Sequence, residues 1–274
     1  MTPARDGTDG GRRRLLAGGA ALAGAAALGL TALGCSDDDD AADGDAASGD
    51  AGDGGSEATT TTAGAAAADG PTTLTAADFA ALAPCLLTPE QTERPFYLSA
   101  DLERRDITEG RPGRALRLGL QVVDAECVPV PGAVVDLWHA DAVGDYSAFV
   151  DGSYADEAGE GTTFLRGSQV ANAEGIVEFA TVYPGWYPGR AVHVHVKAHL
   201  DGVTMLTSQL YLPEDLTDEV HAEGPYADHG TRDTRNEDDG FAGDPEAAGN
   251  LVTASAAGDA TLGLVVLGVD PSSA

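Results

Sequence analysis

Positive charge is scarce in this sequence. It has 45 Asp and Glu residues against 15 Lys and Arg, with Lys197 as the one lysine, and its formal net charge is −30 at pH 7. Such an acidic surface repels phosphate groups. The composition therefore argues against nucleic acid and against anionic lipid as binding partners.

Helical periodicity is nearly absent as well. At least six short runs instead alternate as half-buried strands do, and turn residues separate them. These runs are Leu116–Val123, Ala133–His139, Ile176–Val182, Ala191–Leu200, Thr204–Leu212 and Ala260–Val269. A short helical turn is expected between Thr75 and Leu82, with Thr75 as its N-cap. The pattern predicts an all-β fold, an antiparallel β-sandwich or a related barrel, rather than alternating β and α units.

The first 35 residues have the features of a targeting segment. Three arginines at positions 12–14 precede an uncharged run, mostly of Ala, Gly and Leu, that ends at Leu33. This pattern is typical of a cleavable twin-arginine signal, so we expect export to an extracytoplasmic location. Leu33-Gly34-Cys35 resembles a lipoprotein cleavage site, after which Cys35 would be lipidated and anchor the protein to the membrane. A plain cleavable signal and an uncleaved anchor are the alternatives.

Large apolar side chains are almost missing between residues 36 and 72, where Asp, Ala, Gly, Ser and Thr predominate. Such a segment cannot bury enough surface to offset the entropy lost on ordering. We expect it to be a flexible acidic linker. Residues 73–274 then remain for one domain, which is long enough to form a full core.

Cysteine is rare, with three in the whole sequence. If Cys35 is lipidated, Cys85 and Cys127 remain as a pair in an oxidising compartment, which favours a disulfide between them. Two buried free thiols are the alternative. A metal role is disfavoured because neither cysteine belongs to a closely spaced pair.

Two long segments of low hydrophobicity, 141–169 and 213–249, interrupt the strands. Loops of this length in a compact domain are usually functional or disordered. We interpret Glu237-Asp238-Asp239 in the second loop as a solvated acidic face, because the Gly and Glu spacing of a calcium loop is missing. Four histidines are interpreted as structural or exposed, namely His139, His199, His221 and His229.

The segment 183–197 joins an aromatic, Pro- and Gly-rich loop to a strand. Alternation puts His193 and His195 on one face of that strand and the valines at 192, 194 and 196 on the other. Two imidazoles on one face indicate a metal site, although zinc and copper sites also use such pairs. Phenolate oxygen prefers a hard, highly charged cation, so Tyr187 and a second tyrosine would favour Fe(III). We choose Tyr146 as the second tyrosine, because Gly144 lets the chain turn back before it.

Several of these segments together resemble the intradiol ring-cleavage dioxygenase family. The family's first tyrosine ligand follows a segment similar to the one here that runs from Leu137-Trp138-His139-Ala140-Asp141 to Gly144-Asp145-Tyr146-Ser147. Further similar segments are Leu87–Tyr97, Phe164-Leu165-Arg166-Gly167, Gly175–Phe179, Tyr183-Pro184-Gly185-Trp186-Tyr187 and Arg190–His195. The resemblance covers about residues 85 to 242, and the full set in this order is specific to the family.

The resemblance implies a non-haem Fe(III) cofactor bound by Tyr146, Tyr187, His193 and His195, with a hydroxide in the fifth position. Tyr187 corresponds to the tyrosine that leaves the metal when a catechol binds as a dianion. The long loops of the sandwich would then form the metal site.

The resemblance also assigns residues to the substrate. Arg190 corresponds to the arginine that stabilises negative charge on the substrate, Gln209 resembles a pocket glutamine, and Trp138 would lie in the wall near the iron. The implied activity is that of an oxidoreductase in aromatic catabolism. A catechol-type ring is cleaved between its two hydroxyl-bearing carbons with O2, both oxygen atoms are incorporated, and a muconate-type diacid forms.

The sequence departs from the family pattern in three ways. Five residues separate Tyr187 from His193, whereas cytoplasmic members carry a longer insertion, so the identity of the catechol stays open. Arg94 replaces a glycine of the N-terminal arm. The family's helical dimerisation region is missing, which leaves the oligomeric state open. Two alternatives remain: a non-catalytic exported β-sandwich that binds a metal or ligand, and a copper or zinc enzyme that uses the same histidines.

Overall fold

The computed structural model describes residues 73–82, 85–93, 96–98, 102–150, 153–154 and 162–273. The expected signal peptide, Cys35, the linker and Arg94 lie outside the described residues, so these predictions stay predictions. Within the described part of the chain, no helix has both the length and the apolar character needed to cross a membrane.

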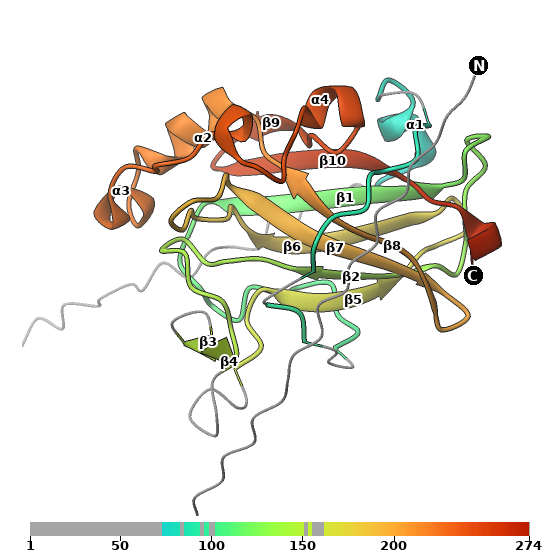
Figure 1. Ribbon diagram of the computed structural model, residues 1–274, viewed down its shortest axis with the longest axis horizontal. Helices are drawn as coiled ribbons and strands as arrows, with labels where there is room; N and C mark the ends of the chain where they lie inside the picture. The colour runs from blue at the N-terminus through green and yellow to red at the C-terminus, as the bar shows by residue number, and fades with distance from the viewer. Residues whose placement is uncertain are drawn as a thin grey trace, which may run out of the picture. The chain divides into compact units, whose positions relative to one another are not determined.

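Two four-stranded sheets form the body of the described domain (Figure 1). In what we call the first sheet the order is β6 (Ile176–Val182), β1 (Ala115–Val123), β10 (Ala260–Gly268) and β9 (Thr253–Ala257). In the second sheet it is β5 (Arg166–Val170), β2 (Val134–Trp138), β7 (His193–Leu200) and β8 (Val203–Tyr211). A small hairpin pairs β3 (Phe149–Val150) with β4 (Ser153–Tyr154).

The predicted antiparallel β-sandwich is confirmed, with one exception. Strands β1 and β10, which lie far apart in the sequence, pair in parallel, while the other strand pairs are antiparallel. The six predicted runs correspond to β1, β2, β6, β7, β8 and β10. Strands β3, β4, β5 and β9 were not predicted. Strand β5, Arg-Gly-Ser-Gln-Val, lacks an apolar alternation, and β9, Thr-Ala-Ser-Ala-Ala, is mostly exposed and has only small side chains.

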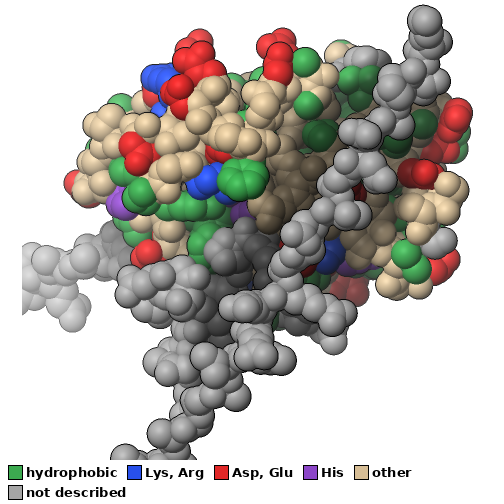
Figure 2. Space-filling model, in the orientation of Figure 1, with side chains coloured by type: hydrophobic (Ala, Val, Ile, Leu, Met, Phe, Trp, Pro, Cys, Tyr) green, Lys and Arg blue, Asp and Glu red, His purple; other side chains and the backbone are tan. Residues whose placement is uncertain are grey.

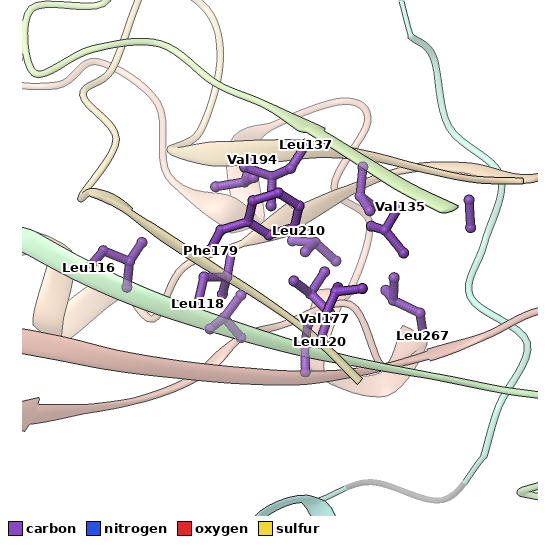
Figure 3. Packing of buried hydrophobic residues seen from close by; sticks show 14 of the residues in the cluster. Leu116, Leu118, Leu120, Val135, Leu137, Val177, Phe179, Val194, Leu210 and Leu267 are labelled. Carbon is purple, nitrogen blue, oxygen red and sulfur yellow. The ribbon is translucent and has the colours of Figure 1, made fainter. Parts of the chain in front are cut away.

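Apolar side chains from both sheets meet between the layers. Leu116, Leu118 and Leu120 of the first sheet point toward Val194 and Leu210 of the second (Figure 3). These side chains are fully buried. Burying a large aliphatic side chain stabilises a fold by about 1.5–3 kcal/mol, so this interior supplies most of the stability. The inner position of Val194 also confirms that His193 and His195 lie on the opposite face of β7.

Short helices lie outside the first sheet, above β9 and β10 in Figure 1. The N-terminal turn is α1 (Ala76–Phe79), and the backbone N–H of Thr75 donates to the Asp78 carboxylate at 2.8 Å. Segment 213–249 contains α2 (Glu214–His221), α3 (Tyr226–His229), the 3-10 helix η1 (Asn236–Asp238) and α4 (Pro245–Ala248). A second 3-10 helix, η2 (Pro271–Ser273), ends the described chain. Segment 213–249 is therefore a folded cap with short helices rather than a bare loop.

A disulfide joins Cys85 to Cys127, whose Cα atoms are 5.3 Å apart. It closes a stretch of 42 residues and ties the arm that carries Cys85 to the turn after β1. In the face shown in Figure 2, Asp and Glu side chains are spread over the surface and few cationic groups interrupt them. This distribution agrees with the acidic composition.

Candidate metal centre

Four side chains form a row across the second sheet. Trp138 of β2 is the cross-strand partner of Arg166 on one side and of His195 on the other, and His195 is in turn paired with Gln209 of β8. Cross-strand partners project from the same face of a sheet. Because Val194 and Val196 point into the core, the row lies on the outer face. All four residues of the row are nevertheless buried, so other segments cover this face.

The covering segments carry aromatic rings. Phe96 and Tyr97 come from the N-terminal arm, Tyr146 from the loop after β2, and Tyr187 from the loop before β7. The Phe96 ring stacks on Tyr146 with 4.0 Å between the ring centroids and 6° between their planes. These rings and Trp138 form a small cluster of their own, separate from the main core. The cluster keeps water away from the histidines beneath it.

Two histidines converge below these rings. The Nδ1 atom of His193 lies 2.7 Å from the carbonyl oxygen of Ala191, to which it donates in the neutral tautomer. That bond leaves Nε2 of His193 as an acceptor, and this atom lies 3.2 Å from Nε2 of His195. The His195 ring stacks on Trp138 at 4.9 Å, which fixes its plane. Two ring nitrogens are thereby directed at one small volume.

Both histidines are kept neutral. Burial, followed by the positive charge of Arg190, lowers the pKa of His193 to about 3. Burial and the neighbouring His193 lower the pKa of His195 well below its ordinary value. A neutral imidazole with a free lone pair is the form that binds a metal ion.

The two tyrosines approach the same volume. The Tyr187 hydroxyl lies 3.1 Å from Nε2 of His193. The rings of Tyr146 and Tyr187 are 5.8 Å apart in an edge arrangement, and Tyr146 lies 6.0 Å from His195 by ring centroids. The Tyr146 hydroxyl is buried and has no hydrogen-bond partner among the described residues. A buried polar atom without a partner is costly, and a cation at this point would remove that cost.

Two glycines allow the tyrosine-bearing loops to touch. Gly144 has a φ of +86°, and a Cβ atom there would collide with the carbonyl oxygen of Trp186. On the other loop, Gly185 donates its N–H to the carbonyl of Asp141 at 3.0 Å, and a Cβ on it would meet that same backbone. The loops of Tyr146 and Tyr187 are therefore positioned against each other by direct backbone contact.

The donor set fits a highly charged cation. No group of three His, Cys, Asp or Glu side chains that could hold a metal occurs among the described residues, so a metal at the histidine pair would need other donors, such as the tyrosines. Burial raises the pKa of Tyr146 well above its ordinary value, and the adjacent Tyr187 raises it further. Burial also raises the pKa of Tyr187, although Arg190 opposes this. Only a strongly Lewis-acidic ion would displace both protons, and such ions prefer phenolate oxygen.

Arg190 lies beside this group and has a buried partner. Its Nε donates to Asp239 at 2.9 Å, Nη1 donates to the Tyr187 hydroxyl at 3.4 Å, and Nη2 donates to the side-chain oxygen of Gln209. The same Asp239 oxygen accepts the backbone N–H of Ala191 at 2.8 Å. The guanidinium is thus held in one orientation, facing both Tyr187 and the end of the row.

The interpretation of Asp239 as part of a solvated face was wrong. Asp239 is buried, while Glu237 and Asp238 beside it are exposed. The other oxygen of Asp239 accepts the N–H of Phe241, whose ring covers the Arg190 guanidinium at 4.7 Å. Phe241 is the only large apolar residue between positions 228 and 250, but its ring is half exposed, so no clear signal in the sequence indicated that Asp239 is buried.

The four histidines interpreted as structural or exposed all have structural contacts. His139 is buried between Thr181 and the carbonyl of Ala140, and burial lowers its pKa to about 4. His199 pairs with Asp136 at 2.9 Å. The other two fasten the Tyr187 loop to the helical cap: His221 lies 3.1 Å from the Pro184 carbonyl, and His229 lies 3.1 Å from the Trp186 carbonyl.

Comparisons with known proteins agree with this geometry. A family model described as "Dioxygenase" matches residues 89–227, just over half of the chain. An intradiol ring-cleavage dioxygenase from Tetranychus urticae is 32% identical, with a TM-score of 0.63 over 68% of this chain and 96% of that one. A second dioxygenase structure is also 32% identical, with a TM-score of 0.61 over 68% and 95% of the two chains.

Among curated proteins, a chlorocatechol 1,2-dioxygenase from Rhodococcus opacus is 29% identical over 124 residues. The match covers 38% of this chain and 46% of that protein, so this chain spans less than half the length of its curated relative. The fold, the family model and the structural neighbours define an oxidoreductase scaffold of the β-sandwich type. The chain belongs to the intradiol ring-cleavage dioxygenase family, whose members generally use Fe(III).

Proposed function

We propose that this protein is an Fe(III)-dependent intradiol dioxygenase that cleaves a catechol-type ring with O2. The observation that carries the proposal is the convergence of two neutral histidines and two buried tyrosines, one of which has no hydrogen-bond partner among the described residues. Tyr146, Tyr187, His193 and His195 would hold the metal. Bound Fe(III) would supply Lewis acidity that activates the catechol ring toward O2.

Tyr187 is the residue suited to accept a proton from the substrate. Burial raises its pKa, so a proton on the Tyr187 oxygen is held firmly. Its hydroxyl lies 3.4 Å from Nη1 of Arg190, which would orient it. Tyr187 would therefore take up one proton from a bound catechol at its hydroxyl oxygen.

Arg190 would stabilise the charge that develops on the ring. Its guanidinium is largely buried, with 12% of the side chain exposed, and Asp239 and Gln209 hold it in place. A fixed cation in a water-poor site stabilises a transition state by several kcal/mol, because no reorganisation is needed when the charge appears. Trp138 would form the wall beneath the substrate.

The overall reaction is balanced by the substrate and dioxygen alone. The diacid product keeps every carbon and hydrogen atom of the catechol and gains both oxygen atoms of O2. One carbon–carbon bond and the O–O bond break, and each of the two hydroxyl-bearing carbons gains one oxygen atom. The sequence leaves the ring substituents open, so a panel of catechols is the appropriate probe.

The test uses the domain 73–274 expressed with its disulfide and loaded with iron. We expect O2 uptake with at least one catechol, and with 18O2 a diacid whose mass rises by two 18O atoms. Extradiol products would contradict the reaction assigned here. Absence of O2 uptake with every catechol would favour the non-catalytic sandwich, and full zinc or copper occupancy without iron would favour the alternative metals.

We also propose that the protein is exported by the twin-arginine route and anchored through Cys35. The proposal is supported by the arginines at positions 12–14, the uncharged run that follows, and the lipobox-like Leu33-Gly34-Cys35. Replacing Arg13 and Arg14, the pair directly before Leu15 and Leu16, with lysines should retain iron-loaded protein in the cytoplasm. Cys35→Ala should release exported protein from the membrane fraction. Unchanged fractionation of either variant would contradict the corresponding half of the proposal.

A further inference from the structure

Arg166 is a buried cation at the end of the row opposite Gln209. It is the first residue of β5, the cross-strand partner of Trp138, and only 3% exposed. To acceptors in the described part of the chain, its guanidinium donates three hydrogen bonds. Nε donates to the Ser147 hydroxyl at 2.7 Å, Nη2 to the Ser147 carbonyl at 2.8 Å, and Nη1 to the Phe96 carbonyl at 2.7 Å.

These acceptors belong to the two neighbours that fix Tyr146. Ser147 follows Tyr146 in the chain, and the ring of Phe96 stacks on the ring of Tyr146. Arg166 therefore joins the N-terminal arm to the loop after β2 at the point where both touch this phenol. The guanidinium is planar and presents its donors in a rigid fork, which the single ammonium of a lysine cannot reproduce.

The charge of Arg166 also acts on Tyr146. Burial lowers the pKa of Arg166 to about 10, so the side chain remains a cation at neutral pH. The Tyr146 hydroxyl lies in a dry site, where a nearby positive charge is screened weakly. Arg190, followed by Arg166, opposes the effect of burial on the pKa of Tyr146. Arg166 differs from Arg190 in being hydrogen-bonded to the neighbours of Tyr146.

We propose that Arg166 is the positioning residue of Tyr146, holding its ring in place through Ser147 and Phe96 in the orientation that a metal ligand requires. This inference rests on the proposed function, because it assigns Arg166 to a ligand of that same site. If Arg166 served only to tie the N-terminal arm to the sheet, replacing it would leave the tyrosinate-to-iron band unchanged.

The test compares wild-type protein with Arg166→Lys, Arg166→Met and Ser147→Ala, each loaded with iron. Ser147→Ala removes one acceptor while the arginine charge stays, so it separates orientation from charge. Arg117→Lys is the matched control, because Arg117 lies on the first sheet and is paired with Glu178. The readouts are iron content, the tyrosinate-to-iron charge-transfer band, and kcat and KM with the best catechol.

We expect the charge-transfer band of both Arg166 variants to shift and weaken, and kcat to fall about 10- to 100-fold while KM changes less. Ser147→Ala should give a smaller change in the same direction, and it keeps the proposal testable if the Arg166 variants fail to fold. The Arg117→Lys spectrum should match wild type. Variants that fold and bind iron with the wild-type band and kcat would overturn the role of Arg166 alone. Wild-type protein that binds iron without a tyrosinate band would overturn both this inference and the proposed function.

Discussion

Asp239 and Arg190 form a buried ion pair, with the Arg190 Nε donating to an Asp239 oxygen at 2.9 Å. The carboxylate is fully buried and also accepts two backbone N–H groups, from Ala191 and Phe241. Those bonds and the charge of Arg190 keep the pKa of Asp239 below its ordinary value, although burial alone would raise it. The pair links the helical cap of segment 213–249 to the site.

We predict that Asp239→Asn lowers kcat/KM for the catechol substrate about 10- to 100-fold. The amide retains the shape of the carboxylate but not its charge, so the guanidinium is no longer held by an ionic partner in its present orientation. Steady-state O2 uptake measures the effect, with the exposed neighbour in Asp238→Asn as control. Equal kcat/KM values for Asp239→Asn and wild type would show that Arg190 is oriented by its other contacts.

Gly144 is predicted to be indispensable for the metal site. Gly144→Ala introduces a methyl group against the Trp186 carbonyl at a backbone angle that disfavours any side chain. Gly243→Ala is the matched control, because Gly243 also has a positive φ but faces open space. The control should lose about 1 kcal/mol of stability from backbone strain. Gly144→Ala should lose more and should also bind less iron, as measured by chemical denaturation and metal analysis. Similar losses in both variants would contradict contact between the two loops as the cause.

Glu178 is predicted to make stability depend on pH. Arg117 donates to both of its oxygens at 2.8 Å, and Arg105 also donates to it. Burial alone would raise the pKa of Glu178, but these two arginines lower it below its ordinary value. A lowered folded-state pKa means that the ionised carboxylate stabilises the fold above the unfolded-state pKa. This contribution is lost as the pH falls through the folded-state value.

Urea unfolding at about pH 7 and about pH 3 tests this dependence. Glu178→Gln should be less stable than wild type at the higher pH and should lose less stability on acidification. Asp259→Asn, at an exposed turn between β9 and β10, serves as control. Parallel losses of stability in wild type and Glu178→Gln would refute the prediction.

Local patterns predicted most of the fold. The alternation around His193 and His195 gave the strand, its inner valine face and its outer histidine face, because a strand has a fixed period of two. The same rule missed β5, since Arg166-Gly167-Ser168-Gln169 presents no apolar alternation. Most of β5 was therefore expected to lie within the loop 141–169.

The site was harder to predict where it depends on strand register. Arg166, Trp138, His195 and Gln209 are far apart in sequence, and only the pairing of four strands puts them in one row. Tyr146 and Tyr187 were predicted as metal ligands from the preference of phenolate for hard cations and from the family resemblance. Asp239 was missed because a carboxylate in an acidic run is usually solvated, and its burial depends on tertiary contact with Arg190.

The most direct test of the central claim is the visible absorption of the iron-loaded protein and of its tyrosine variants. We predict one Fe(III) per chain and a broad tyrosinate-to-iron band, weakened in both Tyr146→Phe and Tyr187→Phe. The band should persist in Tyr226→Phe, which removes a buried hydroxyl that donates to the Tyr183 carbonyl and lies outside the proposed ligand set. A colourless protein with full zinc or copper occupancy, or an iron band unchanged by both ligand substitutions, would contradict the account.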